Sequence, residues 1–338
     1  MAENGKIIIA LDAMGGDFAP QETVKGAVEA VNADNNLSVK LFGVENKVSA
    51  ELSKYMFDSE RIEVVDCPDV IETCEPPVKA IKTKKDSSMV RALYAVKNNE
   101  ADAVVSCGNT GALLVGGQLI VGRIRGIERA ALAFLVPSLK EPVMLVDAGA
   151  NVDCRPEMLL QFAQMGSIYM ADVVHRKDPK VGLINIGEEE EKGNAQVKQT
   201  LPLMKECADI NFVGSVQSRE MTDGIVDIVV CDGFIGNTIL KTYEGVAASM
   251  ITKLKGSLTG GGLGTKIGAA LVKGSLKSML REFSVEEYGG APMLGLKNLV
   301  VKTHGNSLSP EIRNAIMQCR DFVNADIAGK ITARLGKQ

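Results

Sequence analysis

Short runs of Val, Ile and Leu recur along this chain, and five of them stop in a small-residue loop that carries Gly, Asn or Asp. These five segments are residues 6–17, 103–111, 143–153, 181–194 and 226–237. Apolar runs bounded by turn residues are typical of strands that a parallel sheet buries on both faces. Because such runs alternate here with helical periodicity, the pattern predicts an α/β fold with a largely parallel sheet.

The same periodicities predict where the individual elements begin and end. Strands are expected at about 6–12, 37–43, 61–66, 103–106, 131–136, 143–147, 181–186, 211–213, 226–230 and 298–303. Helices are expected at about 21–33, 45–57, 88–98, 109–121, 156–172, 193–207, 235–253 and 265–283. The stretch 67–88 is expected to be a loop broken by prolines, 255–264 a flexible segment, and 288–295 a glycine-rich turn.

In parallel sheets, ligands bind outside the carboxyl ends of the strands, where loops lead into helix N-termini. We therefore expect the five polar loops to lie on one edge and to form one composite site. Glycines let backbone N–H groups approach a ligand closely, and helix N-termini favour anions. The expected ligand is small and anionic, with phosphate as the first choice.

Composition excludes several classes of function. The net charge is −4, there is no Trp, and no basic segment alternates with aromatic residues, so we expect no nucleic acid partner. Seven cysteines without a CxxC pair, together with only two histidines, argue for a reducing cytosol and against a disulfide framework or a metal centre. The first residues do not resemble a signal peptide, and no apolar run is long enough for a transmembrane helix.

The first polar loop, residues 11–17, has the sequence LDAMGGD. It lacks both the GxGxxG dinucleotide fingerprint and the GxxxxGK[ST] phosphate loop. A tight turn explains Gly15 and Gly16, but it explains the flanking Asp12 and Asp17 less well. We therefore take all four residues as candidates for substrate or phosphate binding.

The loop at 106–114 offers Asn109 or Thr110 as a helix N-cap, while Gly108 and Gly111 open the approach to it. Free N–H groups there could hold phosphate or a thioester oxyanion. Cys107 is a possible nucleophile for acyl transfer with His304 as its base. A small buried cysteine is the more common case, and we prefer it.

Lys192 follows four glutamates and could act as a point charge for phosphate beside Asn194. Asp232 and Asn237 follow the strand at 226–230. His304 lies in a glycine-containing loop after the last predicted strand, where a histidine is more often functional than elsewhere.

The predicted helix at 265–283 is amphipathic. Ile267, Leu271 and Leu276 are spaced to form an apolar stripe, and Lys273 and Lys277 lie beside it. An ordinary surface helix packed on the core is one interpretation. The other is a helix lying on an anionic membrane surface, which the basic row in an acidic protein favours.

The motifs taken together resemble one family, the bacterial phosphate acyltransferases of phospholipid synthesis, also called fatty acyl-acyl carrier protein:phosphate acyltransferases. The matching segments are ALDAMGGDFAP, SCGNTGALL, LVDAGANVDCRP, NIGEEEEKGN, VCDGFIGN, YGGAPMLG and HGNS. They occur in the family order and span about residues 6 to 333. Only the long glutamate run at 188–191 departs from the family pattern.

The resemblance implies transfer of a long-chain acyl group from acyl carrier protein to inorganic phosphate. The acyl phosphate then passes to a membrane glycerol-3-phosphate acyltransferase. The family fold is Rossmann-like and two-lobed, similar to isocitrate and isopropylmalate dehydrogenases and to phosphotransacetylase. It implies a cytoplasmic homodimer with no cofactor. Residues 1–338 would form a single catalytic unit of two α/β lobes around one cleft, with residues 255–283 attaching it peripherally to the membrane.

Roles within the site are assigned by hypothesis. Lys192, Asn194 and the Gly15–Gly16 turn would hold phosphate, and Asn109 and Thr110 would polarise the thioester carbonyl. His304 would protonate the leaving sulfur, while Asp232 and Asn237 orient these groups. The full set expected to bind substrate or phosphate is Asp12, Gly15, Gly16, Asp17, Gly108, Gly111, Asn151 and Asn194.

Acyl carrier protein is acidic, so its docking site should be basic. The densest basic cluster is Lys79, Lys82, Lys84 and Lys85, with Arg123 and Arg125 as the alternative. Two other functions stay open at this point. One is a decarboxylating dehydrogenase of the similar fold, which NAD binding would reveal. The other is a non-catalytic scaffold for a membrane acyltransferase.

Overall fold

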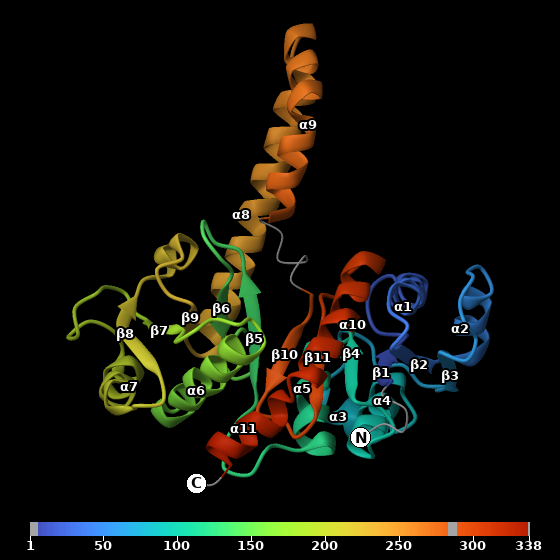
Figure 1. Cartoon of the computed structure of the whole chain (residues 1–338), viewed down its shortest axis with the longest axis horizontal. Helices are drawn as coiled ribbons and strands as arrows, with labels where there is room; N and C mark the ends of the chain where they lie inside the picture. The colour runs from blue at the N-terminus through green and yellow to red at the C-terminus, as the bar shows by residue number, and fades with distance from the viewer. Residues whose placement is uncertain (1–5, 283–288, 337–338) are drawn as a thin grey trace.

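The computed structural model describes residues 6–282 and 289–336, which form one sheet of eleven strands with helices on both faces (Figure 1). The strands are β1 Ile7–Asp12, β2 Leu37–Gly43, β3 Ile62–Asp66, β4 Ala103–Ser106, β5 Ala131–Val136, β6 Val143–Val146, β7 Lys180–Ile184, β8 Asn211–Val216, β9 Ile228–Val230, β10 Ala291–Leu294 and β11 Leu299–Lys302. Their order in the sheet is β3-β2-β1-β4-β11-β10-β5-β6-β9-β7-β8.

Helices connect most of these strands. They are α1 Gln21–Ala33, α2 Glu45–Leu52, α3 Pro77–Thr83, α4 Ser88–Lys97, α5 Thr110–Gly116, η1 Gly117–Val121, α6 Pro156–Asp172, α7 Ala195–Glu206, η2 Ser218–Asp223, α8 Gly233–Gly260, α9 Leu263–Glu282, α10 Ser309–Asn324 and α11 Ile327–Leu335. Within the described ranges, none of these helices is long and apolar enough to span a bilayer. Figure 1 shows α8 and α9 as a hairpin that projects away from the rest of the molecule.

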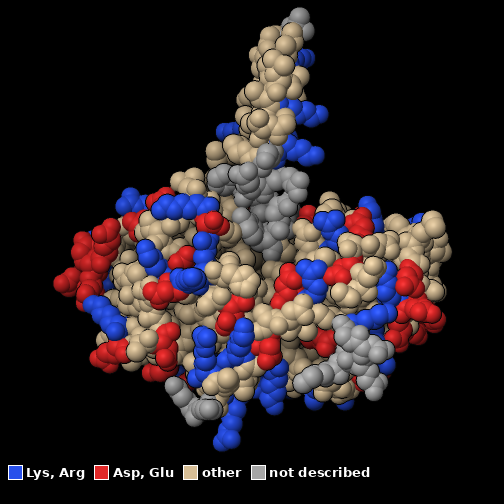
Figure 2. Space-filling view, in the orientation of Figure 1, with Lys and Arg blue, Asp and Glu red and all other residues tan. Residues whose placement is uncertain are grey.

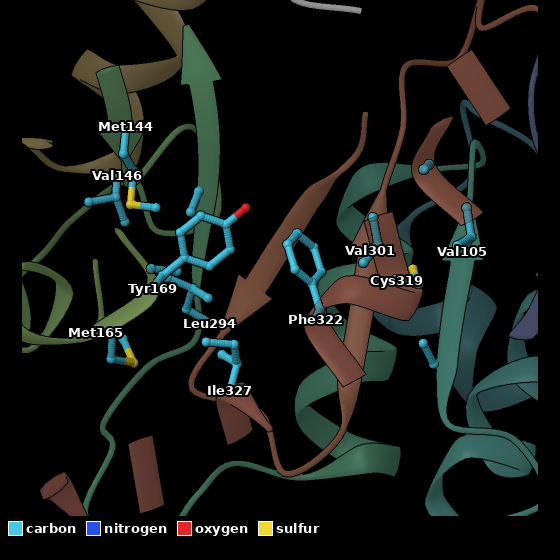
Figure 3. Close-up of a cluster of buried hydrophobic side chains, with 14 of the residues drawn as sticks. Val105, Met144, Val146, Met165, Tyr169, Leu294, Val301, Cys319, Phe322 and Ile327 are labelled. Carbon is cyan, nitrogen blue, oxygen red and sulfur yellow. The ribbon is translucent and has the colours of Figure 1, made fainter. Parts of the chain in front are cut away.

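The core lies on both faces of the sheet, as expected for strands buried on two sides. Side chains alternate along β1, so that Ile9 and Leu11 belong to one hydrophobic cluster and Ala10 belongs to the other. The hydrophobic cluster that contains Ile9 and Leu11 extends across the molecule. In it, Tyr169 of α6 packs against Phe322 of α10, with ring centroids 5.3 Å apart (Figure 3). Both rings are almost fully buried.

The directions of the strands do not agree with the prediction of one shared edge. Strands β1, β4 and β11 run parallel to one another, and so do β6, β9 and β7. Between these groups, β10 pairs antiparallel with β11 and with β5, and β5 pairs antiparallel with β6. Three reversals make the two parallel groups point in opposite directions. The polar loops therefore form two groups at opposite edges, and the single-edge prediction is wrong.

The predicted flexible segment 255–264 is mostly helical. Helix α8 continues to Gly260, and only Gly261 and Gly262 separate it from α9. Glycine inside a helix costs about 1 kcal/mol relative to alanine, but tertiary packing overrides such propensities. Here the half-buried Leu254 and Leu258 lie four residues apart on one side of α8, and α8 packs against α9. Residue 283, the predicted end of the second helix, lies outside the described residues.

Other boundaries also moved. The loop predicted at 67–88 contains the short helix α3, and the strand predicted at 211–213 continues to Val216. The turn predicted at 288–295 contains β10, a buried four-residue strand. It pairs antiparallel with β11, the next strand in the chain, and with the distant β5; the glycines and the proline within residues 289–295 made this strand look like a turn.

Candidate active site

The first group of loops forms what we call the first cluster, at the carboxyl ends of β1, β4 and β11. It comprises Asp12, Gly15, Gly16, Cys107, Lys302 and His304. Backbone hydrogen bonds tie the three loops together, because Asp17 N donates to Gly305 O at 2.7 Å and Thr303 N donates to Ser106 O at 3.1 Å. Residues almost 300 positions apart in the chain thus meet at one edge of the sheet.

Asp12 is the last residue of β1 and is only 1% exposed. Its Oδ2 accepts a hydrogen bond from Ser106 Oγ at 2.7 Å, whereas its Oδ1 is buried and makes no hydrogen bond to the described residues. Burial raises the pKa of Asp12, although the hydroxyls of Ser88 and Ser106 oppose the shift. The carboxyl is therefore a group whose proton is held more tightly than usual.

Gly15 and Gly16 are required for the close approach of these loops. A Cβ on Gly15 would lie 2.6 Å from Asp12 Oδ2 and 2.7 Å from Gly108 N. Gly16 has a φ of +104°, which side chains rarely adopt. Its Cβ would also lie 2.9 Å from the Cβ of Cys107. The turn residues predicted from the sequence are thus packed directly on Asp12 and on the β4 loop.

Cys107 and Lys302 are both buried behind this turn. Thr303 Oγ1 lies 2.8 Å from Cys107 Sγ. The Lys302 ammonium donates hydrogen bonds to Cys107 O at 3.3 Å and to Thr303 O. Burial raises the pKa of Cys107 to about 11 and lowers the pKa of Lys302 to about 8. At neutral pH the cysteine is therefore a thiol, which makes it a poor nucleophile.

His304 joins the first cluster to the other half of the molecule. Its Nε2 lies 3.5 Å from Glu244 Oε1 of α8, and its ring centroid is 5.5 Å from that of Phe134 in β5. The side chain of His304 is 21% exposed, so solvent or a substrate can reach it. The predicted catalytic histidine therefore lies where the loop after β11 meets α8.

Asn109 has the predicted N-cap geometry, and both ends of its amide are used. Oδ1 accepts from Ala112 N at 3.0 Å, while Nδ2 donates to three carbonyl oxygens in residues 72–75. Thr110 is exposed at the first position of α5. A Cβ on Gly111 would lie 2.7 Å from Pro77 of α3. Asn109 and Gly111 thus fix α5 and α3 together, and Thr110 faces solvent.

The second group of loops, which we call the second cluster, lies at the ends of β6 and β9. Asn151 donates from its backbone and side-chain nitrogens to Asp147 Oδ2, at 2.7 and 2.8 Å. Its carbonyl accepts from Gly233 N at 2.7 Å. Asp232 caps α8 by accepting from Ile235 N at 2.9 Å. Asn237 is exposed on the next turn of α8, beside Gly149.

Lys192 and Asn194 lie in the loop after β7. Lys192 forms an ion pair with Glu189 at 2.8 Å, and its side chain is 48% exposed. Asn194 caps α7 by accepting a hydrogen bond from Val197 N at 2.9 Å. This loop reaches the second cluster through Gln196, whose Nε2 donates to Cys154 O at 2.6 Å.

Helix α8 connects the two clusters. It begins at Asp232 in the second cluster and passes His304 at Glu244, twelve residues later. At 1.5 Å per residue, this separates the two positions by about 18 Å along the helix axis. Asp12, the Gly15–Gly16 turn, Cys107 and His304 are therefore brought together. Asp232 and Asn151 belong to a separate group about three helical turns away.

Sequence reasoning missed three residues that shape the first cluster and its connection, namely Lys302, Glu244 and Thr303. A lysine at the end of a short strand resembles an ordinary solvent-exposed residue. The one available signal was its position two residues before the HGNS motif. Glu244 could not be found, because its contact with His304 depends on the path of α8.

The predicted apolar stripe of α9 divides between two sides of the helix. Ile267 and Leu271 are 56% and 82% exposed, whereas Leu276 and Leu280 are half-buried. Leu280 also lines a groove with α8. The reason is that α8 occupies one side of α9 along the hairpin, so only part of the stripe can face outward. Lys273 and Lys277 are exposed, as predicted.

The predicted docking lysines lie on and directly after α3. Lys79, Lys82 and Lys85 are exposed. Lys84 is different, because its ammonium forms an ion pair with Glu75 at 2.5 Å and donates to Val70 O at 2.6 Å. This ion pair lowers the pKa of Glu75. Three of the four lysines are therefore available to a partner.

Known structures share this fold. A phosphotransacetylase from Streptococcus pyogenes superposes with a TM-score of 0.60 at 17% identity, covering 94% of this chain and 95% of that one. A phosphotransacetylase from Staphylococcus aureus gives 0.59 at 15% identity, covering 94% of both chains. Their likeness confirms the predicted α/β fold.

The sequence itself identifies the family. A family model described as "Fatty acid synthesis protein" matches residues 7–330. A phosphate acyltransferase from Clostridium acetobutylicum is 49% identical over 97% of this chain and 99% of its own length. A phosphate acyltransferase from Clostridium botulinum is 47% identical over 98% of each chain. The chain therefore belongs to the fatty acid synthesis protein family, in agreement with the resemblance found in its motifs.

Proposed function

We propose that this protein transfers a fatty acyl group from acyl carrier protein to inorganic phosphate, giving acyl phosphate for phospholipid synthesis. The observation that carries the proposal is 49% identity, over almost the whole of both chains, to a protein named phosphate acyltransferase. In the reaction a phosphate oxygen attacks the thioester carbonyl, a C–O bond forms and the C–S bond breaks. The proton that phosphate loses ends on the carrier's sulfur.

The site must therefore hold an anion, stabilise an oxyanion and supply a proton to sulfur. We assign His304 to the proton transfer, since it is partly exposed and close to Glu244. Thr110 and the backbone N–H groups at the start of α5 stabilise the oxyanion, and Asn109 holds that helix end in place. Asp232 and Asn237 orient α8 against the site, with Asn151 as their anchor.

The residues predicted to bind phosphate divide between the two clusters, which lie about 18 Å apart, so a single phosphate ion contacts only one of them. The Gly15–Gly16 turn with Asp12, Asp17 and Gly108 belongs to the first cluster, and Lys192 with Asn194 lies near the second. Binding at Lys192 requires the phosphate to draw Lys192 away from Glu189. Direct contact of Lys192 with the phosphate would make Lys192→Ala raise the barrier for kcat/KM by about 2–4 kcal/mol, and a smaller effect would place the phosphate in the first cluster alone. An unchanged KM for phosphate would remove Lys192 from the site.

Acyl carrier protein docks, in this proposal, on the exposed lysines of α3. That helix packs against α5 through Pro77 and Gly111, so a partner seated on Lys79 and Lys82 lies beside the first cluster. Lys84 is a poor test position, because reversing its charge would also break the ion pair with Glu75. Lys82 and Lys85 carry no such structural ion pair among the described residues.

Peripheral attachment of this cytoplasmic enzyme to an anionic membrane is assigned to the α8–α9 hairpin. Residues 245–280 contain five lysines and no Asp or Glu. Figure 2 shows the hairpin with basic side chains and without acidic ones on the visible face. Each lysine near an anionic surface contributes about 1 kcal/mol. The exposed Ile267 and Leu271 would enter the interface, where the product can pass to a membrane glycerol-3-phosphate acyltransferase.

A homodimer is assigned to the other side of the same hairpin. Residues of η2, α8 and α9 line an apolar groove of about 660 Å³. Val246 and Met250 in this groove are 55% and 67% exposed, which is unusual for large apolar side chains in a monomer. Met250→Asp is expected to reduce the molar mass measured by light scattering by half. A mass that does not change would place the interface elsewhere.

The activity itself is tested by incubating the pure protein with palmitoyl-acyl carrier protein and phosphate. Acyl phosphate should form in a time- and phosphate-dependent manner. Hydrolysis of the thioester without acyl phosphate, or no reaction at all, would contradict the proposed function.

A further inference from the structure

Lys302 is a buried cation that has no carboxylate partner in residues 6–282 and 289–336. It is the last residue of β11 and is 5% exposed. Its ammonium contacts the carbonyl oxygens of Cys107 and Thr303, and among the described residues no carboxylate oxygen lies within 4.0 Å of it. Burying a charge in this way is costly unless a counter-ion is present. A bound anionic ligand would neutralise the buried ammonium and offset this cost.

The loop after β11 and helix α8 indicate the side from which an anion would reach Lys302. Lys302 is two residues before the partly exposed His304, and Gly305 lies between His304 and the exposed end of the loop. Lys241 of α8 is exposed, forms an ion pair with Glu244 at 2.8 Å, and acts electrostatically on Lys302 from the facing half of the molecule. Cations from β11 and from α8 thus both contribute positive potential where the loop after β11 meets α8.

The acidic groups near Lys302 do not neutralise it directly. Asp12 and Asp17 favour its charged form electrostatically, but neither forms an ion pair with it, and Asp12 is itself buried with a raised pKa. Cys107 is a thiol at neutral pH because burial raises its pKa to about 11. The positive charge of Lys302 is therefore available to a bound ligand.

We propose that Lys302 is a catalytic residue that binds the reacting inorganic phosphate. The phosphate would lie between the Gly15–Gly16 turn and His304, and Lys241 of α8 would face the phosphate from the opposite side. This inference rests on the proposed function and adds a phosphate ligand that the motifs do not reveal. It places the nucleophile in the first cluster, next to the histidine that supplies the proton. Because Lys192 lies near the second cluster, it then contributes less to phosphate binding than Lys302.

The same phosphate chemistry could come from a phosphate ester carried by the acyl donor instead of from free phosphate. The experiment therefore measures phosphate binding without any donor. Thermal unfolding of the wild type is followed with increasing inorganic phosphate, since a ligand that binds only the folded state raises the melting temperature. The variants are Lys302→Met and the matched control Lys297→Met, an exposed lysine before the same strand.

Phosphate should raise the melting temperature of the wild type and of Lys297→Met, but not that of Lys302→Met. In turnover, Lys302→Met should raise the KM for phosphate about 10- to 150-fold, the equivalent of a charge-assisted hydrogen bond, with the KM for acyl carrier protein unchanged. The melting temperature of Lys302→Met in phosphate-free buffer reports whether the variant is folded.

Two results would overturn the inference. The first is an equal phosphate-induced stabilisation in Lys302→Met and the wild type. The second is an increase only in the KM for acyl carrier protein, which would assign Lys302 to the carrier's phosphate ester. Because the unfolding measurement needs no acyl donor, it gives its answer even if the protein transfers acyl groups to another acceptor.

Discussion

Replacing Lys302 by methionine is expected to stabilise the protein without phosphate while impairing its activity. Burial lowers the pKa of this lysine from 10.5 to about 8. One pKa unit corresponds to 1.36 kcal/mol, so burying the ammonium costs about 3 kcal/mol at pH 7. Methionine has a similar length and removes that cost. Two carbonyl oxygens lose a donor at about 1 kcal/mol each, which leaves a net gain of about 1 kcal/mol.

The stability gained by Lys302→Met is expected to depend on pH. Below pH 8 the lysine is charged in both the folded and the unfolded protein, and the full cost of burial is present. Between pH 8 and 10.5 the unfolded chain binds more protons than the folded one, so the wild type becomes more stable as pH rises. The difference between Lys302→Met and the wild type should therefore shrink as pH rises above 8 and change sign near about pH 9, where the wild type has regained about 1 kcal/mol. Asp12, Asp17, Cys107 and Lys241 act electrostatically on Lys302 in the wild type, and the same four groups are present in Lys302→Met.

Urea unfolding of both proteins at pH 7, 9 and 10.5, in phosphate-free buffer, measures this difference. Comparison at each pH cancels the titration of shared groups that do not interact with Lys302; the pKa of Cys107 and of Asp12, which Lys302 lowers, changes with the substitution. A gap that does not change with pH would refute the reasoning, because the cost would then not come from the lysine's charge. A wild type more stable at pH 7 would show that the carbonyl contacts outweigh desolvation.

Three further changes test the remaining assignments. Cys107→Ser should keep most of the activity, and mass spectrometry should find no acylated Cys107 during turnover, because a thiol with a pKa of about 11 provides little thiolate. Lys82→Glu with Lys85→Glu should raise the KM for acyl carrier protein, more strongly at low salt. Leu271→Glu should release the protein from anionic vesicles in a flotation assay, whereas Leu276→Glu should lower the melting temperature, since only Leu276 is half-buried.

Each of these three predictions has an outcome that would contradict it. An acyl-cysteine trapped during turnover would replace direct attack by phosphate with a covalent route. An unchanged KM in the double lysine variant would move the docking site to Arg123 and Arg125. Flotation of Leu271→Glu with the vesicles would assign membrane attachment to a protein partner.

The local pattern was sufficient wherever a property depends on neighbouring residues. Alternation of apolar and polar positions located most strands and helices, because burial on two faces of a sheet imposes the same pattern in any context. The N-cap was likewise readable at Asn109, since a cap bonds a backbone N–H only a few residues away, whereas the caps at Asn194 and Asp232 were not predicted. The motifs, read in order, also identified the family.

Properties that depend on contacts between residues far apart in the chain could not be predicted from the sequence. The insertion of β10 between β11 and β5 reverses the sheet direction and separates the second cluster from the first. Its partner β5 lies far away in the chain, although β11 follows it directly. In the same way, the path of α8 sets the contact of Glu244 with His304 and decides which side of α9 is exposed.

Lys302 shows the limit most clearly. In the sequence it is one lysine at the end of a strand, a place where lysines are usually solvated. Its burial follows only when the loop after β4 packs against it, with the loop after β1 held close to that loop by Gly15 and Gly16. The sequence by itself thus determined the elements, the caps and the family. The tertiary structure decided which charges are buried together, because burial is a property of the whole packed fold and not of any single segment.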